Sequence, residues 1–245
     1  MTRRALVTGA SRGIGAATAH ALADSGHRVA VHYRSGAEEV QAVCESLHGD
    51  GHVTVRGDLG KNEAEQVVNE TVEKLGGLDV LVNNAGVYFF HPISTTSFEE
   101  WQDAWRRTVE LNLYGPADLA WHAVRHMTEG ARIINVGSRG AYRGEPDAPA
   151  YGAAKAGLHA MTQSLAQSLA PQGIAVAAVA PGFVNTEMVT DLMASPAGDA
   201  IRAQSPFGRV AEPEEVAAAV AWLASEQATW ASGTIMDVNG ASYLR

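Results

Sequence analysis

The chain alternates short, β-branched apolar runs with longer alanine-rich stretches of helical period. This alternation is typical of βαβ units arranged around a parallel sheet. The predicted strands are Ala5–Gly9, Arg28–Tyr33, His52–Gly57, Leu78–Asn84, Arg132–Ser138, Ile174–Gly182 and Thr234–Gly240. The predicted helices begin near Ile14, Ala37, Lys61, Ser97, Ala150 and Pro213. Nearly continuous apolar strands are buried on both faces, so we predict one doubly wound α/β domain over residues 1–245, with a seven-stranded parallel sheet and helices on both faces.

Two helix starts carry local signals. Ser35, with Glu38 three residues later, predicts a capping box at the start of the second helix. Glu212 followed by Pro213 predicts the start of the last helix, because proline suits the first helical turn.

Residues 186–210 escape the alternation and form a longer connection than is usual in such folds. Long connections often form lids or binding loops, so we predict a substrate-binding lid here. The apolar residues expected to line its pocket are Met188, Val189, Leu192, Met193, Ile201 and Phe207. The alternative is a helical pair that only covers the edge of the sheet.

Composition limits the partners of the protein. The formal net charge of -9 argues against a broad nucleic-acid surface, although a local basic pocket stays open. Cys44, the single cysteine, can form neither an intrachain disulfide nor a thiolate cluster. No apolar run approaches the length of a membrane span, and the first residues lack the apolar region of a signal peptide. We therefore expect a soluble, cytoplasmic protein that binds no membrane.

Histidine spacing gives little support for a metal site. His122 and His126 are one helical turn apart, but no acid or cysteine accompanies them at metal-ligand spacing. No metal is predicted.

A glycine-rich turn follows the first predicted strand. It reads Thr8-Gly9-Ala10-Ser11-Arg12-Gly13-Ile14-Gly15 and leads into a helix. Glycines in this strand-turn-helix context let the backbone approach a pyrophosphate at the helix N-terminus, where amide hydrogens favour anions. The turn therefore predicts a dinucleotide site.

The end of the second strand indicates which dinucleotide binds. An acid there would hold the ribose 2′-hydroxyl of NAD, but the chain has His32, Tyr33 and Arg34. Arg34, with Arg12 from the glycine turn, can instead pair with a 2′-phosphate. We predict NADP rather than NAD.

Tyr151 and Lys155 are separated by four residues in an alanine-rich helical stretch and therefore lie on one helical face. A ketone that accepts hydride develops negative charge on its oxygen and needs a proton donor there. Lowering a phenol pKa from about 10 to about 7 takes roughly 4 kcal/mol. An ammonium about 4 Å away can supply that much at an effective dielectric near 20, so this pair predicts a tuned proton donor.

With these motifs the chain resembles the classical short-chain dehydrogenase/reductase family over nearly its whole length. The residues that match are the turn Thr8–Gly15, Asn83-Asn84-Ala85-Gly86, and the active-site set Asn112, Ser138, Tyr151 and Lys155. The resemblance implies a single-domain Rossmann fold. It also implies that Ser138 orients the substrate oxygen, that Lys155 holds the nicotinamide ribose, and that Asn112 supports a water chain delivering protons to Lys155.

Further cofactor contacts are implied by the same resemblance. Asp58-Leu59 is similar to the adenine contact of the family, and Pro181-Gly182 with Thr186 to its nicotinamide-side loop. Together, the glycine turn, the strand-end arginine and the resemblance predict these cofactor-binding residues: Gly9, Ser11, Arg12, Gly13, Ile14, Gly15, Arg34, Asp58, Leu59, Asn84, Ala85, Gly86, Tyr151, Lys155, Pro181, Gly182, Val184 and Thr186.

The substrate class is less constrained. The chain is most similar to 3-oxoacyl-acyl-carrier-protein reductases of fatty acid biosynthesis, but it departs from them at Asn239-Gly240-Ala241 and in the segment before Tyr151. Docking of an acidic carrier protein would require a basic patch, for which the available arginines are Arg106, Arg107, Arg125, Arg139 and Arg143. A sugar, steroid, quinone or other small ketone is the alternative substrate, and a catalytically silent NADP-binding regulator is the alternative function. The family resemblance also implies a homotetramer built through helices around residues 97–127 and 150–170.

Overall fold

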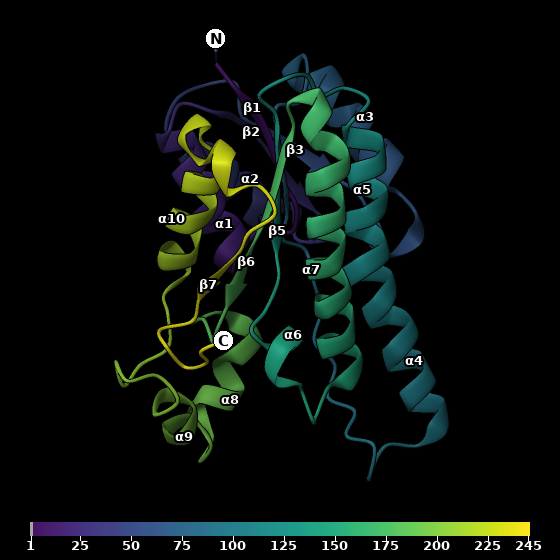
Figure 1. Ribbon diagram of the computed structural model, residues 1–245, viewed down its shortest axis with the longest axis vertical. Coiled ribbons are helices and arrows are strands. Elements are labelled where there is room, and N and C mark those ends of the chain that lie inside the picture. The colour runs from purple at the N-terminus through teal and green to yellow at the C-terminus, as the bar shows by residue number, and fades with distance from the viewer. Residues whose placement is uncertain (1) are drawn as a thin grey trace.

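The computed structural model describes residues 2–245, without the side chains of Met188 and Asp191. Its centre is a seven-stranded parallel sheet in the order β3-β2-β1-β4-β5-β6-β7 (Figure 1). The strands are β1 Arg4–Val7, β2 Arg28–Tyr33, β3 Val53–Arg56, β4 Val80–Asn83, β5 Arg132–Val136, β6 Ala175–Pro181 and β7 Ile235–Val238. Six strands lie within predicted strands, and β1 begins one residue before its predicted start at Ala5, which confirms the predicted sheet.

Ten α-helices connect the strands within the described residues. They are α1 Gly13–Asp24, α2 Ala37–Ser46, α3 Ala64–Leu75, α4 Phe98–Val109, α5 Gly115–Ala123, α6 Gly140–Arg143, α7 Pro149–Leu169, α8 Thr190–Ala194, α9 Gly198–Arg202 and α10 Pro213–Ala224. A π-helical turn, Glu110–Tyr114, joins α4 to α5, and short 3₁₀ turns lie at Leu59–Lys61, Ala170–Gln172, Glu187–Val189 and Glu226–Ala231.

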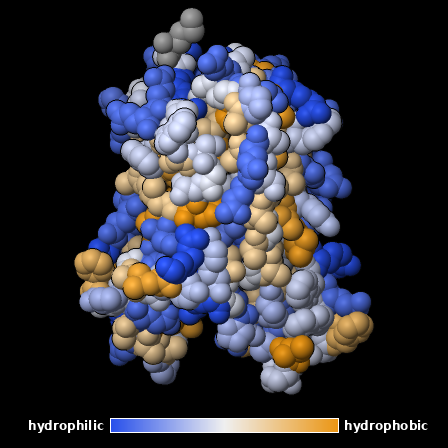
Figure 2. All heavy atoms as spheres, in the orientation of Figure 1, coloured by the Kyte–Doolittle hydropathy of each residue, from blue (hydrophilic) through white to orange (hydrophobic). Residues whose placement is uncertain are grey.

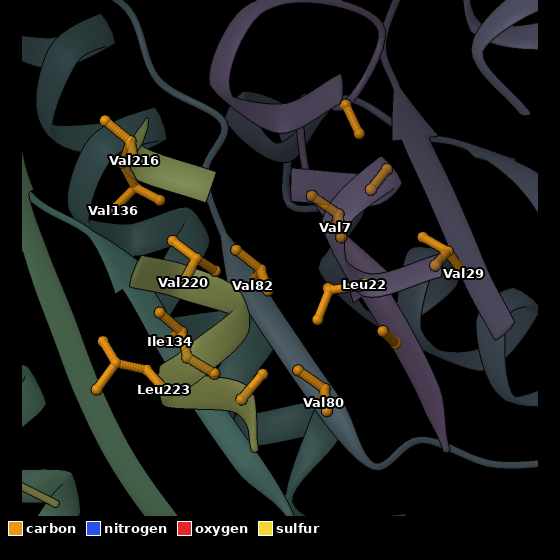
Figure 3. Packing of buried hydrophobic residues seen from close by; sticks show 14 of the residues in the cluster. Val7, Leu22, Val29, Val80, Val82, Ile134, Val136, Val216, Val220 and Leu223 are labelled. Atoms are coloured by element: carbon orange, nitrogen blue, oxygen red, sulfur yellow. The ribbon is translucent and has the colours of Figure 1, made fainter. Parts of the chain in front are cut away.

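The helices cover both faces of the sheet, as a doubly wound fold requires. Helices α1, α2 and α10 pack on one face, and α3, α5 and α7 pack on the other. On the first face Val216, Val220 and Leu223, spaced at helical period along α10, lie over β4 and β5 (Figure 3). These apolar rows bury the two faces of the sheet.

The two predicted helix starts have different outcomes. Glu212 is the N-cap of α10 with Pro213 at its first position, and Glu215 completes a capping box there. The capping box predicted at Ser35 is wrong, because Gly36 is the N-cap of α2 and makes no side-chain cap hydrogen bond. Gly36 adopts a left-handed φ of 82°, and this turn places Ser35 outside the helix start.

The helix expected near Lys61 begins later, at Ala64. Asp58 accepts a hydrogen bond from the backbone of Gly60 and starts a 3₁₀ turn instead. Asn62 then takes a left-handed φ of 61°, which separates this turn from α3.

The carboxyl ends of the strands meet at one end of the molecule, the lower end in Figure 1, where α6, α8 and α9 also gather. Figure 2 shows that this end is hollowed between two lobes. Since the strand order reverses at β1, with β2 on one side and β4 on the other, ligands are expected at this edge. Within residues 2–245, every helix is too short or too polar to cross a lipid bilayer.

Candidate active site

The glycine turn between β1 and α1 has the shape that a pyrophosphate requires. Gly9 and Gly13 have positive φ values of 62° and 55°. A Cβ on Gly15 would lie 2.3 Å from the carbonyl oxygen of Gly9, so a larger residue would disrupt the turn. A Cβ on Gly13 would lie 3.1 Å from Cγ2 of Thr186, which places the predicted nicotinamide-side loop directly opposite the turn. The free amides at the start of α1 therefore fit a dinucleotide phosphate.

His32 organises this turn, a role that the sequence interpretation missed. Its Nδ1 accepts a hydrogen bond from the Gly9 amide at 3.1 Å, so the imidazole hydrogen is on Nε2, which donates to the Gly57 carbonyl at 3.1 Å. Burial lowers the pKa of His32 to about 4 and keeps the ring neutral. The sequence at His32 indicates only that the strand end lacks an acid. A polar imidazole after the apolar residues of the strand is the signal that points to its hydrogen bond with the glycine turn.

The predicted adenosine side has one exposed and one paired arginine. Arg34 is exposed beyond the end of β2. Arg12 forms an ion pair with Glu187, at the start of the predicted lid, so in this structure its guanidinium is directed across the glycine turn. Leu59 is buried, and the Asp58 carboxylate is held by the Gly60 amide at 3.1 Å.

The loop after β4 is tied to the glycine turn through Thr8. The Thr8 hydroxyl accepts hydrogen bonds from the amides of Asn84 and Ala85 at 2.9 and 3.0 Å. The Asn84 side chain donates to the carbonyls of Thr8 and Gly9 at 2.8 and 3.1 Å. These bonds hold the predicted cofactor residues Asn84, Ala85 and Gly86 beside the turn.

The four predicted catalytic residues come together at the same edge. A Cβ on Gly86 would lie 3.2 Å from Asn112 Oδ1 and 3.7 Å from Lys155 Nζ. The Tyr151 ring centroid lies 5.7 Å from Lys155 Nζ. Ser138 follows β5, and its hydroxyl lies beside the Tyr151 phenol.

The electrostatics of Tyr151 differ from the sequence expectation. Burial raises its pKa to about 12, and the Ser138 hydroxyl offsets this only in part. The Lys155 ammonium donates to the Val136 carbonyl at 2.7 Å, and its Nζ lies 5.7 Å from the centroid of the Tyr151 ring. Burial lowers the pKa of Lys155 to about 8. In the protein alone, Tyr151 is therefore a neutral, protonated phenol rather than one whose pKa is near 7.

Asn112 is held by backbone groups. Its Oδ1 accepts from the Val87 amide and its Nδ2 donates to the Val87 carbonyl, both at 2.9 Å. It lies in the π-helical turn between α4 and α5. Tyr88, the next residue of this loop, packs edge-on against Tyr151 at 5.2 Å between ring centroids and is a site residue that the sequence interpretation missed.

The predicted lid consists of two short helices, α8 and α9, near the site. A cavity of about 320 Å³ lies between this segment and the end of β7, and of the six apolar residues predicted to line a pocket, Ile201 and Phe207 line this one. The side chain of Met188 lies outside the described residues. Pro181 ends β6, Gly182 packs against Asn239, and Val184 is buried.

The five arginines predicted as a possible basic docking patch are not all free cations on the surface. Arg139 is 3% exposed and so is not part of the surface. Arg106 and Arg107 both pair with Asp103, and Arg143 pairs with Glu145. Two acids, Asp103 and Glu145, therefore compensate part of the positive charge of these arginines. Among residues 2–245, histidine, cysteine and acidic side chains form no cluster of three or more that could hold a metal ion.

Known proteins with similar sequences share this architecture. The 3-oxoacyl-[acyl-carrier-protein] reductase of Staphylococcus aureus is 36% identical over 249 residues, which cover 100% of this chain and 99% of that protein. The cis-4-hydroxycyclohexanecarboxylate dehydrogenase of Sinomonas cyclohexanicum is 39% identical over 97% of this chain and 95% of its own length. A family model described as enoyl-(acyl carrier protein) reductase matches residues 9–241.

The chain is a short-chain dehydrogenase/reductase. Among solved structures, a short-chain dehydrogenase from Burkholderia cenocepacia in complex with NADP is similar, with a TM-score of 0.89 and 33% identity over 98% of this chain and 97% of that one. The match confirms the family and the Rossmann fold, and the neighbour's NADP agrees with the cofactor predicted from the end of β2. Membership in this family makes the protein an oxidoreductase.

Proposed function

We propose that this short-chain dehydrogenase/reductase reduces a ketone to a secondary alcohol with NADPH, or catalyses the reverse oxidation. The observation that carries the proposal is the meeting of Ser138, Tyr151 and Lys155 at the strand edge beside the glycine turn. The residues proposed to hold the cofactor are those of the glycine turn, the Asn84–Gly86 loop, Arg34 and the segment from Pro181 to Thr186.

Each catalytic side chain has a separate role in the protonation of the substrate oxygen. NADPH held at the glycine turn and the Pro181–Thr186 segment would be the source of the hydride for the carbonyl carbon. Tyr151, protonated because its pKa is raised to about 12, donates the proton to the oxygen. Ser138 donates a hydrogen bond to the same oxygen, and the Lys155 ammonium stabilises the negative charge that forms on the oxygen and phenol. Asn112 positions the loop after β4 and completes the proposed proton relay to Lys155.

A 3-oxoacyl thioester, free or on a carrier protein, is the first substrate class in this proposal, because several curated relatives carry the name of 3-oxoacyl-acyl-carrier-protein reductase. Small cyclic ketones are the second, since one relative is named for a hydroxycyclohexanecarboxylate. A role in fatty acid biosynthesis, a homotetramer and a cytoplasmic location belong to the same proposal.

The reaction is tested by NADPH oxidation with 3-oxoacyl thioesters, cyclic ketones and quinones, repeated with NADH. The Tyr151→Phe protein should lose most turnover, at least about 100-fold for loss of a positioned proton donor, and still bind NADPH in a fluorescence titration. Tyr114→Phe, which removes the hydroxyl of an exposed tyrosine in the π-helical turn, is the matched control. Full turnover in Tyr151→Phe contradicts the mechanism, and NADPH binding without turnover on any ketone favours the silent regulator.

A further inference from the structure

Arg139 is a buried cation without an acidic partner among the described residues. It directly follows Ser138, and its amide donates to the Pro181 carbonyl at 3.0 Å. Its side chain is 3% exposed. The guanidinium donates to Gln204 Oε1 at 2.6 Å and to the Ser242 carbonyl at 3.3 Å, and both acceptors are neutral. An arginine has five N–H donors, so this one retains unused hydrogen-bonding capacity.

This guanidinium forms part of the wall of the cavity of about 320 Å³. The two acids in the same wall already have arginine partners: Glu215 pairs with Arg209 at 2.6 Å, and Asp237 pairs with Arg245 at 2.9 Å. Glu145, an acid outside the cavity wall whose charge acts on Arg139, pairs with Arg143 at 3.4 Å. Arg139 therefore provides the uncompensated positive charge of the cavity wall.

A buried charge is costly unless a counter-charge or several hydrogen bonds compensate it. Burial lowers the pKa of Arg139 to about 10, which still leaves the group protonated at neutral pH. The planar fork of arginine matches a carboxylate or phosphate through two parallel hydrogen bonds. An anionic group in the cavity would supply the missing partner.

We propose that Arg139 binds an oxyanion carried by the substrate, a carboxylate or a phosphate ester, in the cavity between α9 and the end of β7. The inference rests on the proposed ketone reduction, because Arg139 is covalently joined to Ser138 and its cavity adjoins the loop that begins at Gly182. The ketone would lie at Ser138 and Tyr151, and its anionic substituent at Arg139. The proposed substrate class is therefore an oxo acid or an oxo phosphate.

A purely structural role for Arg139 predicts different behaviour. In that role it would only connect Gln204, after α9, to Ser242 in the segment after β7. The same two segments are also joined by the Ser205 hydroxyl, which donates to the Gly240 carbonyl at 2.7 Å. Loss of a structural link would impair charged and neutral ketones equally, whereas loss of an anion site would impair charged ketones alone.

The test compares matched charged and neutral substrates. The first pair is 4-oxocyclohexanecarboxylate and its methyl ester, and the second is acetoacetyl-pantetheine with and without the 4′-phosphate. In the Arg139→Gln protein, kcat/KM for the charged member should fall about 10- to 100-fold, as expected for loss of a charged hydrogen bond. The neutral member should change less than about threefold, and the affected pair identifies carboxylate or phosphate.

The Gln204→Glu protein provides the matched control. Its new carboxylate would neutralise Arg139 while retaining the connection to residue 204, so it should reproduce the selective loss. An equal effect of Arg139→Gln on both members of each pair overturns the proposal, as does a Gln204→Glu protein with unchanged preference for the anion.

A binding measurement separates this inference from the reductase assignment. Isothermal titration of cyclohexanecarboxylate and of phosphopantetheine into the NADP-loaded protein requires no turnover. Binding of either probe that is lost in Arg139→Gln supports the anion site even if no ketone is reduced. If neither probe binds the unaltered protein, or if a bound probe binds Arg139→Gln equally well, the anion site is overturned, while reduction of the neutral ketones would still support the reductase.

Discussion

At the scale of single residues, Lys155 is a charged group whose burial in the site is costly. Its side chain is 4% exposed, and its ammonium has a carbonyl oxygen, that of Val136, as its hydrogen-bond acceptor. Burial lowers its pKa from 10.5 to about 8, which means that folding disfavours the charged form. A group that destabilises the fold yet lies beside the proposed proton donor is expected of a functional residue.

Replacing Lys155 by Met should therefore stabilise the protein and abolish turnover. The gain in unfolding free energy should reach up to about 3 kcal/mol below pH 8, where the lysine is charged in both states. It should shrink between pH 8 and 10.5, because the native lysine loses its proton there while the unfolded one keeps it. Denaturant unfolding across this range measures the effect, with exposed Lys61→Met as control. A difference between Lys155→Met and the unaltered protein that does not vary with pH would contradict burial of the charge as its cause.

At the scale of elements, the π-helical turn between α4 and α5 positions the loop after β4. The turn carries Asn112, whose amide satisfies both backbone groups of Val87. This loop includes Gly86, beside Lys155, and Tyr88, whose ring packs on Tyr151. The π-helical turn thus holds the loop after β4 at the site through Asn112. Such turns are frequent at functional sites.

Asn112→Ala should lower kcat more than its effect on stability explains. Two backbone groups of Val87 would lose their partners, which costs about 1–3 kcal/mol for a buried group. Ser97→Ala, which removes the N-cap of the preceding helix α4, should cost about 1 kcal/mol. Unfolding midpoints and kcat are measured for both proteins. If Asn112→Ala and Ser97→Ala lose the same fraction of kcat for each kcal/mol of lost unfolding free energy, Asn112 contributes to stability alone.

The sequence predicted the elements better than their ends and contacts. Strand apolarity and the glycine turn depend on local patterns, so all seven strands and the start of α1 could be predicted. The start of α2 could not be predicted, because Gly36, in a left-handed conformation, is the N-cap of α2 in place of Ser35. The burial of Arg139 and the bond from Gly9 to His32 join segments distant in sequence, and no local pattern encodes them.

At the scale of the whole molecule, buried neutral histidines should set the acid limit of stability. Burial lowers the pKa of both His32 and His159 to about 4. His32 is hydrogen-bonded on both ring nitrogens, whereas His159 has no hydrogen-bond partner for either nitrogen among the described residues and packs against Tyr142 at 5.0 Å between ring centroids. Both rings therefore favour the neutral form in the folded protein.

The free energy of unfolding should therefore fall as the pH decreases from about 6.5 to about 4. A histidine with a lowered native pKa contributes fully above its unfolded pKa and loses that contribution on acidification. Each ring accounts for up to about 3 kcal/mol over this window. The carboxylates with lowered pKa, such as Asp79 beside Arg4, lose their contributions mainly at lower pH, from about their ordinary pKa of 3.8 downward.

Urea unfolding at pH 7 and pH 5 measures this dependence, and His159→Phe isolates one ring. Phenylalanine preserves the contact with Tyr142 and removes two buried nitrogens without partners, so the variant should be more stable than the unaltered protein at pH 7. It should also lose less stability on acidification to pH 5, while the part due to His32 remains. Because His32 accepts from the Gly9 amide, its protonation in the folded protein, at about pH 4, should weaken NADPH binding in both proteins. Identical pH dependence of unfolding in the two proteins would show that His159 is already paired or solvated in solution, and would leave the other buried histidines, His32 and His27, as the acid-sensitive rings.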